Sequence, residues 1–327
     1  MKKLKLIIAI LLSLVVIPTG GCAFLPPIPW PSQLYEIYTQ IPTELSDAAD
    51  RILPSTVIVD TRYATGTGWV FDESGIVVTN YHVIRDARSV IVTLCDGRRY
   101  STRSFAYDPI SDLAVLFIEA PDLTAAAIGS SAALRTGDRV VAVGNSLGNG
   151  ISVKTGRITR LNMTVDIANQ DFYGLIENTT AIQHGDSGGP LVNKAGEVIG
   201  ISSAKVIGTS EIAYAINIDS ALPILHELIE TGTVAWPYLG ITGDNNPAGR
   251  GVIIEEIDPY GPADKAGLLV GDIILAVDGT TMRNMTELRQ YILSQHVGQD
   301  ITITYRRDGA QAEAVVTLGR RLEQSPA

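Results

Sequence analysis

The sequence predicts a mainly β protein in which two β-barrels form one large unit and a small α+β domain follows. Short β-branched stretches separated by turn signals recur over about 65 residues from Ser55, a spacing typical of a closed antiparallel barrel. A second set of such stretches runs from Val140 to Ile218 and predicts a second barrel. Beyond Trp236, strands bounded by glycine and one further helix indicate a separate, smaller domain.

The predicted strands are short stretches rich in apolar and β-branched residues, and turn signals occur in the first set at Asp72–Gly75, Asp96-Gly97 and Asp108-Pro109. The first set is expected at Thr56–Asp60, Gly68–Phe71, Ile76–Thr79, Ser89–Leu94, Arg99–Ala106 and Ala114–Ile118. The second set is expected at Val140–Val143, Ser152–Ile158, Leu175–Asn178, Leu191–Val192, Val198–Ile201 and Ala213–Ile216. Helices are expected over Glu44–Leu53 and over Asp219–Thr231, the latter capped by Asp219 or Ser220.

Composition narrows the class of protein and of partner. The 327 residues are 46% hydrophobic and 18% charged, as in a chain that folds around a core. The formal net charge is −10 and no basic cluster occurs, so nucleic acid is not an expected partner. The two cysteines, Cys22 and Cys95, provide neither a predicted disulfide nor a metal cluster, and Cys95 is interpreted as a packing residue. No metal or other cofactor is expected.

Residues 1–22 have the pattern of an export signal. Three lysines precede an apolar run from Leu6 to Ile17, which as a helix would reach about 18 Å, short of a roughly 30 Å hydrocarbon core. Gly20-Gly21-Cys22 resembles a bacterial lipoprotein cleavage box, although Thr19 stands where such boxes have Leu. This predicts lipid on Cys22 and an extracytoplasmic protein held by its N-terminus on the membrane of a bacterial cell envelope. Ordinary cleavage and a retained helical anchor are the alternatives.

The segment Gly185-Asp186-Ser187-Gly188-Gly189-Pro190 has the residues of a nucleophilic site. A serine hydroxyl needs a base to remove its proton and backbone N–H groups to receive the oxyanion formed on attack. Flanking glycines allow the tight backbone that aims two N–H groups at one point. We therefore expect an oxyanion hole in residues 185–187, with Gly185 and Ser187 as donors and Asp186 between them. A glycine-rich hairpin without chemistry is the alternative.

A base and a carboxylate occur upstream in matching contexts. His82 follows the strand Val77-Val78-Thr79, and Asp112 directly precedes another apolar strand. The chain order is thus His82, Asp112, Ser187, as in the chymotrypsin-like arrangement. Asp108 is a rival carboxylate, but Pro109 follows it and it is interpreted as the opening of a turn.

These segments resemble the HtrA/Deg family of trypsin-like serine proteases. The resemblance rests on Thr79-Asn80-Tyr81-His82-Val83, Ser111-Asp112-Leu113-Ala114 and Gly185–Pro190, and it extends from about Ser55 to about Arg321. It implies a protease domain of two chymotrypsin-like barrels over residues 44–232 and a PDZ domain over residues 236–321. The sequence departs from the family where His184 and Asp186 replace the usual Pro and Asn.

The resemblance also implies a function and its partners. It indicates an exported, ATP-independent serine endopeptidase that acts on unfolded or misfolded proteins. The specificity pocket is expected along Ile201, Ser202, Ser203 and Ala204, whose small apolar wall favours small aliphatic side chains. The family's N-terminal segment contributes aromatic contacts to a trimer, so the proline-rich tether over residues 23–43 offers Tyr35 and Tyr38 for a homotrimer. Packing of these tyrosines on their own domain is an equal alternative.

The PDZ resemblance implies that peptide C-termini bind by strand addition beside a helix. The expected groove residues are Tyr238, Leu239, Gly240, Ile241, Leu288 and Ile292. Backbone N–H groups near Leu239, Gly240 and Ile241 would hold the peptide carboxylate. The rival function is a catalytically silent PDZ adaptor or chaperone in the cell envelope, which an intact triad disfavours.

Overall fold

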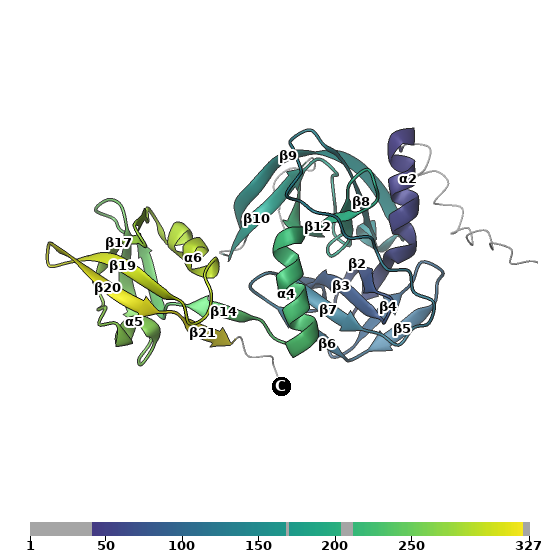
Figure 1. Cartoon of the computed structure of the whole chain (residues 1–327). Helices are drawn as coiled ribbons and strands as arrows, with labels where there is room; N and C mark the ends of the chain where they lie inside the picture. Colours follow the sequence, from purple (N-terminus) through teal and green to yellow (C-terminus); the bar gives the residue numbers. More distant parts are fainter. Residues whose placement is uncertain (1–40, 168–169, 204–211, 323–327) are drawn as a thin grey trace, which may run out of the picture.

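The computed structural model describes residues 41–167, 170–203 and 212–322, which form a large β-rich unit and a smaller one (Figure 1). The prediction of a mainly β fold with two barrels and a small α+β domain is confirmed. Several predicted features lie outside the described residues: the signal segment with Cys22, the tether with Tyr35 and Tyr38, and Ala204. Within the described ranges, no helix has both the length and the apolar character needed to cross a membrane.

The first barrel is a seven-stranded antiparallel sheet with the order β5-β4-β1-β2-β3-β7-β6. Its strands are β1 Thr56–Asp60, β2 Thr65–Asp72, β3 Ile76–Asn80, β4 Val90–Thr93, β5 Arg99–Thr102, β6 Phe105–Asp108 and β7 Leu113–Phe117. The predicted strand Arg99–Ala106 is wrong in one respect, because it divides into β5 and β6, which pair with different neighbours. At the division, the Thr102 hydroxyl donates to the Phe117 carbonyl at 2.6 Å, and the chain turns the corner there.

The second barrel is closed, with the order β10-β13-β12-β11-β8-β9. Its strands are β8 Arg139–Gly144, β9 Ser152–Ile167, β10 Gln170–Asn178, β11 Pro190–Val192, β12 Val198–Ser203 and β13 Ala213–Asn217. β9 and β10 are much longer than predicted and pair from Gln170–Ile167 down to Asn178–Ile158. They form a long hairpin that extends the barrel wall (Figure 1).

Helices join the two barrels to each other. Helix α2 (Thr43–Ile52), followed by the 3₁₀ turn η1 (Leu53–Ser55), packs on β8, and α4 (Ile218–Thr231) lies across β7 and β12 (Figure 1). The predicted cap of α4 is wrong: Asn217 is the N-cap and its side chain accepts from the N–H groups of Asp219 and Ser220. One hydrophobic core, which includes Trp69 and Leu225, continues through both barrels and fixes their relative placement.

The smaller unit is a six-stranded sheet with two helices against it. Its strands are β15 Ile241–Asn245, β16 Val252–Ile257, β17 Ile273–Val277, β18 Thr280–Thr281, β19 Asp300–Arg307 and β20 Ala310–Thr317. Its helices are α5 (Pro262–Lys265) and α6 (Met285–Leu293), and the Asn284 side chain caps α6 by accepting from the Glu287 N–H at 2.8 Å. β14 (Ala235–Tyr238) pairs with β21 (Gly319–Leu322), so both ends of the unit meet beside the two barrels (Figure 1).

Candidate active site

His82 and Asp112 meet at the edge of the first barrel. His82 lies in the one-turn helix α3 (Tyr81–Ile84), which directly follows β3, and Asp112 directly precedes β7, which pairs with β3. The His82 Nδ1 atom lies 2.7 Å from Asp112 Oδ2, and the His82 backbone N–H donates to Asp112 Oδ1 at 3.0 Å. The carboxylate therefore fixes both the position of the ring and the nitrogen that carries the proton.

Asp112 is fully buried and its backbone is held in an uncommon conformation. Its φ of 59° lies in the left-handed region, which Asp and Asn tolerate better than most residues. Its carbonyl accepts from the Tyr81 N–H at 3.0 Å and from the Asn80 side chain at 2.9 Å. These bonds to the segment that carries His82 stabilise the conformation and hold the two residues together.

The loop with Ser187 docks against the first barrel. The Ser187 carbonyl accepts from the Thr67 N–H on β2 at 2.9 Å. Gly188 has a φ of 85°, and a Cβ there would lie 2.3 Å from the Thr67 carbonyl oxygen and 2.9 Å from the Asn80 amide nitrogen. Only glycine permits this approach, which brings the serine loop to the end of β3 where His82 follows.

The residues before Ser187 form a tight turn that orients the Gly185 N–H. The His184 carbonyl accepts from the Leu147 N–H at 2.7 Å, and a trans peptide points its N–H the opposite way, so the Gly185 N–H faces away from Leu147. Within the described ranges, the Gly185 N–H has no hydrogen-bond acceptor. Gly185 has a φ of 95°, and a Cβ there would lie 2.1 Å from the Asn145 carbonyl oxygen, so this turn requires glycine. The Asp186 N–H donates to the Gln183 carbonyl at 3.0 Å, so this N–H is already occupied within the turn. Asp186 therefore contributes to the loop through its side chain.

Asp108, the rival carboxylate, forms its hydrogen bonds within the described ranges with residues other than His82. Its Oδ1 accepts from the Trp236 indole N–H at 2.9 Å and its Oδ2 from the Ser111 N–H at 2.7 Å. Burial raises the pKa of its carboxyl group, and the bonds to Ser111 and Trp236 oppose that rise. Asp108 thus joins the loop before Asp112 to the start of the smaller unit.

The expected specificity residues follow the serine loop on β12. Ser202 exchanges backbone hydrogen bonds with the loop: its carbonyl accepts from the Gly188 N–H and its N–H donates to Gly189, both at 2.8 Å. Ser202 and Ser203 are buried beside this loop, and Ile201 belongs to the hydrophobic core under both barrels. Ser202 is therefore bonded through its backbone to the chain that directly follows Ser187, while Ile201 anchors the strand.

All six expected peptide-binding residues of the smaller unit line one groove of about 370 Å³. β15 is the edge strand of its sheet, and α6 carries Leu288 and Ile292 along the other side. The carbonyls of Leu239 and Gly240 accept hydrogen bonds from the N–H groups of Ala263 and Asp258, both at 3.0 Å. These carbonyls therefore point at groups of the domain itself and not at a carboxylate entering the groove. Burial and a hydrogen bond to Asp258 raise the pKa of the Tyr238 hydroxyl to about 12.

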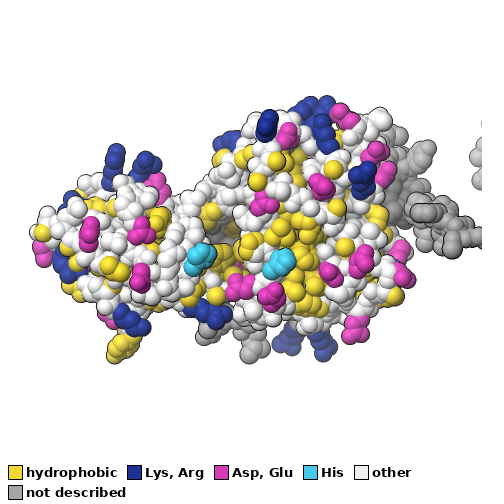
Figure 2. Space-filling model, viewed as in Figure 1, with side chains coloured by type: hydrophobic (Ala, Val, Ile, Leu, Met, Phe, Trp, Pro, Cys, Tyr) yellow, Lys and Arg dark blue, Asp and Glu magenta, His cyan; other side chains and the backbone are white. Residues whose placement is uncertain are grey.

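The groove also contains residues that the sequence did not indicate. Pro109 and Ile110, from the loop between β6 and β7, line it together with Trp236. Figure 2 shows a hollow at the junction of the two units, where apolar side chains are exposed. This loop ends at Asp112, so only a few residues of chain separate the groove from the carboxylate that bonds to His82.

The fold and site define a trypsin-like serine peptidase domain followed by a PDZ domain. The family profile described as a trypsin-like peptidase domain matches residues 66–201, and that of the PDZ domain matches residues 237–318. Within the described ranges, no group of three His, Cys, Asp or Glu side chains could hold a metal ion.

Known proteins extend this likeness over most of the chain. A probable periplasmic serine endoprotease, DegP-like, from Halomonas elongata is 34% identical over 79% of this chain and 57% of its own length. The serine endoprotease from Yersinia pestis has a TM-score of 0.72 and 31% identity, covering 86% of this chain and all of that one. The HtrA-type protease AlgW with a decapeptide has a TM-score of 0.75 and 27% identity, covering 86% and 99%.

The chain therefore belongs to the HtrA family of serine proteases, as its motifs predicted. The chain spans a little over half the length of the bacterial relatives it matches; it covers, for example, 57% of the length of the Halomonas protein.

Proposed function

We propose that this protein is an exported serine endopeptidase whose reaction centre is His82, Asp112 and Ser187. The observation that carries the proposal is the hydrogen bond of 2.7 Å between His82 Nδ1 and Asp112. The serine loop lies next to this pair, and within the described ranges its Gly185 N–H has no acceptor. Family membership supports the same reaction class.

The geometry supports a definite sequence of steps. Asp112 holds the proton on His82 Nδ1, which leaves Nε2 as the base for the Ser187 hydroxyl. Ser187 Oγ attacks the peptide carbonyl, and the N–H groups of Gly185 and Ser187 receive the oxyanion. His82 then donates its proton to the leaving amine, and water hydrolyses the acyl-enzyme with His82 again acting as base.

The substrates we propose are unfolded or misfolded proteins cleaved after small aliphatic residues. Ser202 and Ser203 have short side chains on the strand that pairs with the chain after Ser187, and the described part of this strand offers no acidic group to select a basic side chain. A panel of reporter peptides that differ only at the residue before the cleaved bond tests this preference.

We also propose that the PDZ groove binds peptide C-termini with apolar last residues. The open edge of β15 offers strand addition, and the chain around Leu239 and Gly240 offers N–H groups for the carboxylate. Pro109 and Ile110 would touch the bound peptide from the protease side, so binding can bias the loop that ends at Asp112. Couplings of this kind typically change activity by roughly 5- to 150-fold.

A peptide with a free carboxylate should therefore stimulate cleavage of a small reporter, and the same peptide with a C-terminal amide should not. Equal stimulation by both peptides would mean that they act in the protease cleft.

The remaining proposals concern the N-terminal segment and the bounds of the two domains. We propose a signal segment over residues 1–22, lipid on Cys22 and a tether over residues 23–43, ahead of domains at 44–232 and 236–321. The relatives named periplasmic support an extracytoplasmic location. Attachment to the membrane of a bacterial envelope is proposed from the signal segment and Cys22 alone. Tyr35 and Tyr38 are proposed contacts of a homotrimer. Mass analysis of the membrane fraction should detect a diacylglyceryl adduct that Cys22→Ser abolishes.

The reaction itself is tested by casein cleavage with the purified protein and with Ser187→Ala and His82→Ala. Each variant should lose roughly 10⁶-fold in turnover, and the double variant little more, because the residues act as a unit. Binding of casein without cleavage by the unaltered protein would instead favour a silent PDZ adaptor or chaperone.

A further inference from the structure

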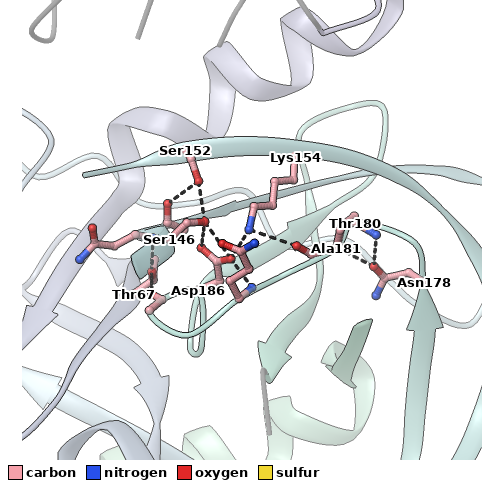
Figure 3. A network of polar contacts seen from close by, with 12 residues as sticks. Thr67, Ser146, Ser152, Lys154, Asn178, Thr180, Ala181 and Asp186 are labelled. Atoms are coloured by element: carbon pink, nitrogen blue, oxygen red, sulfur yellow. Dashed lines mark hydrogen bonds and ion pairs between the residues drawn. The ribbon is translucent and has the colours of Figure 1, made fainter. Parts of the chain in front are cut away.

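A buried ion pair lies directly beside the serine loop. Asp186, the residue before Ser187, is only 2% exposed, and its Oδ2 lies 2.5 Å from the Lys154 ammonium nitrogen. Lys154 comes from β9, opposite Ala142 of β8, and is separated from Asp186 by 32 residues. Figure 3 shows the lysine side chain reaching over the loop to the carboxylate.

The other partners of the carboxylate come from the turn that shapes the loop. The Ser146 hydroxyl lies 2.7 and 3.0 Å from the two Asp186 oxygens, and the Gln183 N–H donates to Oδ2 at 2.7 Å. The Lys154 ammonium also donates to the Ala181 carbonyl at 3.2 Å (Figure 3). One carboxylate therefore joins β9, the 3₁₀ turn η2 (Ser146–Gly148) and both ends of the loop.

The turn held by Ser146 is the one that orients the oxyanion donor. Leu147, the next residue, donates its N–H to the His184 carbonyl at 2.7 Å, and this bond directs the Gly185 N–H to the other side. Ser146 and Leu147 thus contact Asp186 and His184 from one short segment. The position of the carboxylate and the orientation of the peptide between His184 and Gly185 are mechanically linked.

A buried carboxylate needs a compensating charge. Within the described ranges, Lys154 is the cation in contact with Asp186, and its side chain is 21% exposed whereas that of Asp186 is 3% exposed. Removing one partner of such a pair leaves an uncompensated buried charge, which is strongly unfavourable. The carboxylate would then turn toward water, and the chain between Gln183 and Ser187 would turn with it.

We infer that Lys154 is a positioning residue for peptide hydrolysis, acting through Asp186 to hold the Gly185 and Ser187 N–H groups in oxyanion-binding geometry. The inference rests on the proposed function and adds a role for a residue that does not touch the substrate. Loss of one oxyanion donor typically lowers kcat by about 10²–10³-fold. Lys154→Met, which keeps an unbranched apolar stem, should have an effect of that size on kcat and little effect on KM.

The decisive variant is the double substitution Lys154→Met with Asp186→Asn. The amide has the same shape, can still accept from Ser146 and Gln183, and needs no cation. The double variant should therefore recover kcat to within about tenfold of the unaltered protein, since the cost of the unpaired charge is gone. Asp186→Asn alone should lose little, because the partly exposed ammonium can reach water. Lys194→Met, which removes an exposed lysine, is the matched control and should leave kcat unchanged.

The measurements are kcat and KM on a small reporter peptide, with thermal unfolding of each variant. Unchanged kcat in folded Lys154→Met would overturn the inference, as would a double variant no better than the single one. If Lys154→Met does not fold, the double variant decides: folded and active supports the ion pair, whereas unfolded or inactive contradicts it. An inactive unaltered protein, equal to Ser187→Ala, would instead reject the proposed function.

Discussion

Asp112→Asn is the substitution whose effect the structure specifies most fully. The carboxylate accepts two hydrogen bonds with different oxygens, from His82 Nδ1 at 2.7 Å and from the His82 backbone N–H at 3.0 Å. An amide has only one acceptor oxygen. If that oxygen keeps the backbone N–H, the amide NH₂ faces Nδ1 and forces the ring proton to Nε2, where it opposes the Ser187 hydroxyl.

The wrong imidazole tautomer at a triad typically lowers turnover by about 10⁴-fold, or roughly 5 kcal/mol in activation free energy. In the alternative orientation the amide NH₂ faces the His82 backbone N–H, so two donors oppose each other. This costs about 1–3 kcal/mol of unsatisfied hydrogen bonding and would not restore the activity. Folding should persist, because Asn tolerates the left-handed backbone at φ 59° as well as Asp does.

The assay is kcat/KM on a reporter peptide, with the thermal midpoint as a folding control. Asp108→Asn is the matched variant, because Asp108 is also buried and also accepts two hydrogen bonds, from Trp236 and Ser111. It should keep activity within about tenfold, since its bonds do not reach the imidazole. A large loss in Asp108→Asn with a small one in Asp112→Asn would refute the assignment of the carboxylate.

Three further predictions concern other parts of the fold. Gly188→Ala should abolish measurable cleavage, because its Cβ would lie 2.3 Å from the Thr67 carbonyl oxygen and displace the serine loop. The Arg160 hydrogen bond lowers the pKa of Glu177 from 4.5 to about 2, so its stabilising contribution is complete above pH 4.5 and lost toward pH 2. The difference in thermal midpoint between Glu177→Gln and the unaltered protein should narrow over that window. Trp236→Phe, which removes the indole N–H bonded to Asp108, should reduce stimulation by C-terminal peptides while leaving basal cleavage intact.

The parts of the site that the sequence predicted are those with local signals. His82 and Asp112 each adjoin a buried strand, and neighbouring strands of one sheet bring their ends together. The glycines around Ser187 mark a backbone that only glycine can adopt. Such features depend on a few consecutive residues, so a motif contains most of the information.

Features that depend on distant partners were not predicted. Lys154 is one charged residue on a long strand, and nothing nearby in the sequence indicates that it reaches Asp186. Pro109 and Ile110 become part of the groove beside β15 and α6 only because the two domains meet there. The prediction of the α4 cap was wrong for another reason. Asn217, Asp219 and Ser220 can all cap a helix, and Asn217 is the cap because β13 ends there and the helix begins at the next residue.

The central claim is that Ser187 is a nucleophile activated by His82. Mass spectrometry of the protein after reaction with a fluorophosphonate tests it most directly, because the reagent forms a covalent bond only with an activated serine. A single adduct is expected on the peptide that contains Ser187. It should be absent in Ser187→Ala, and its rate of formation should fall at least about 10³-fold in His82→Ala. An adduct on another serine, or labelling of Ser187 at the same rate without His82, would contradict the assignment of Ser187 as nucleophile and His82 as its base.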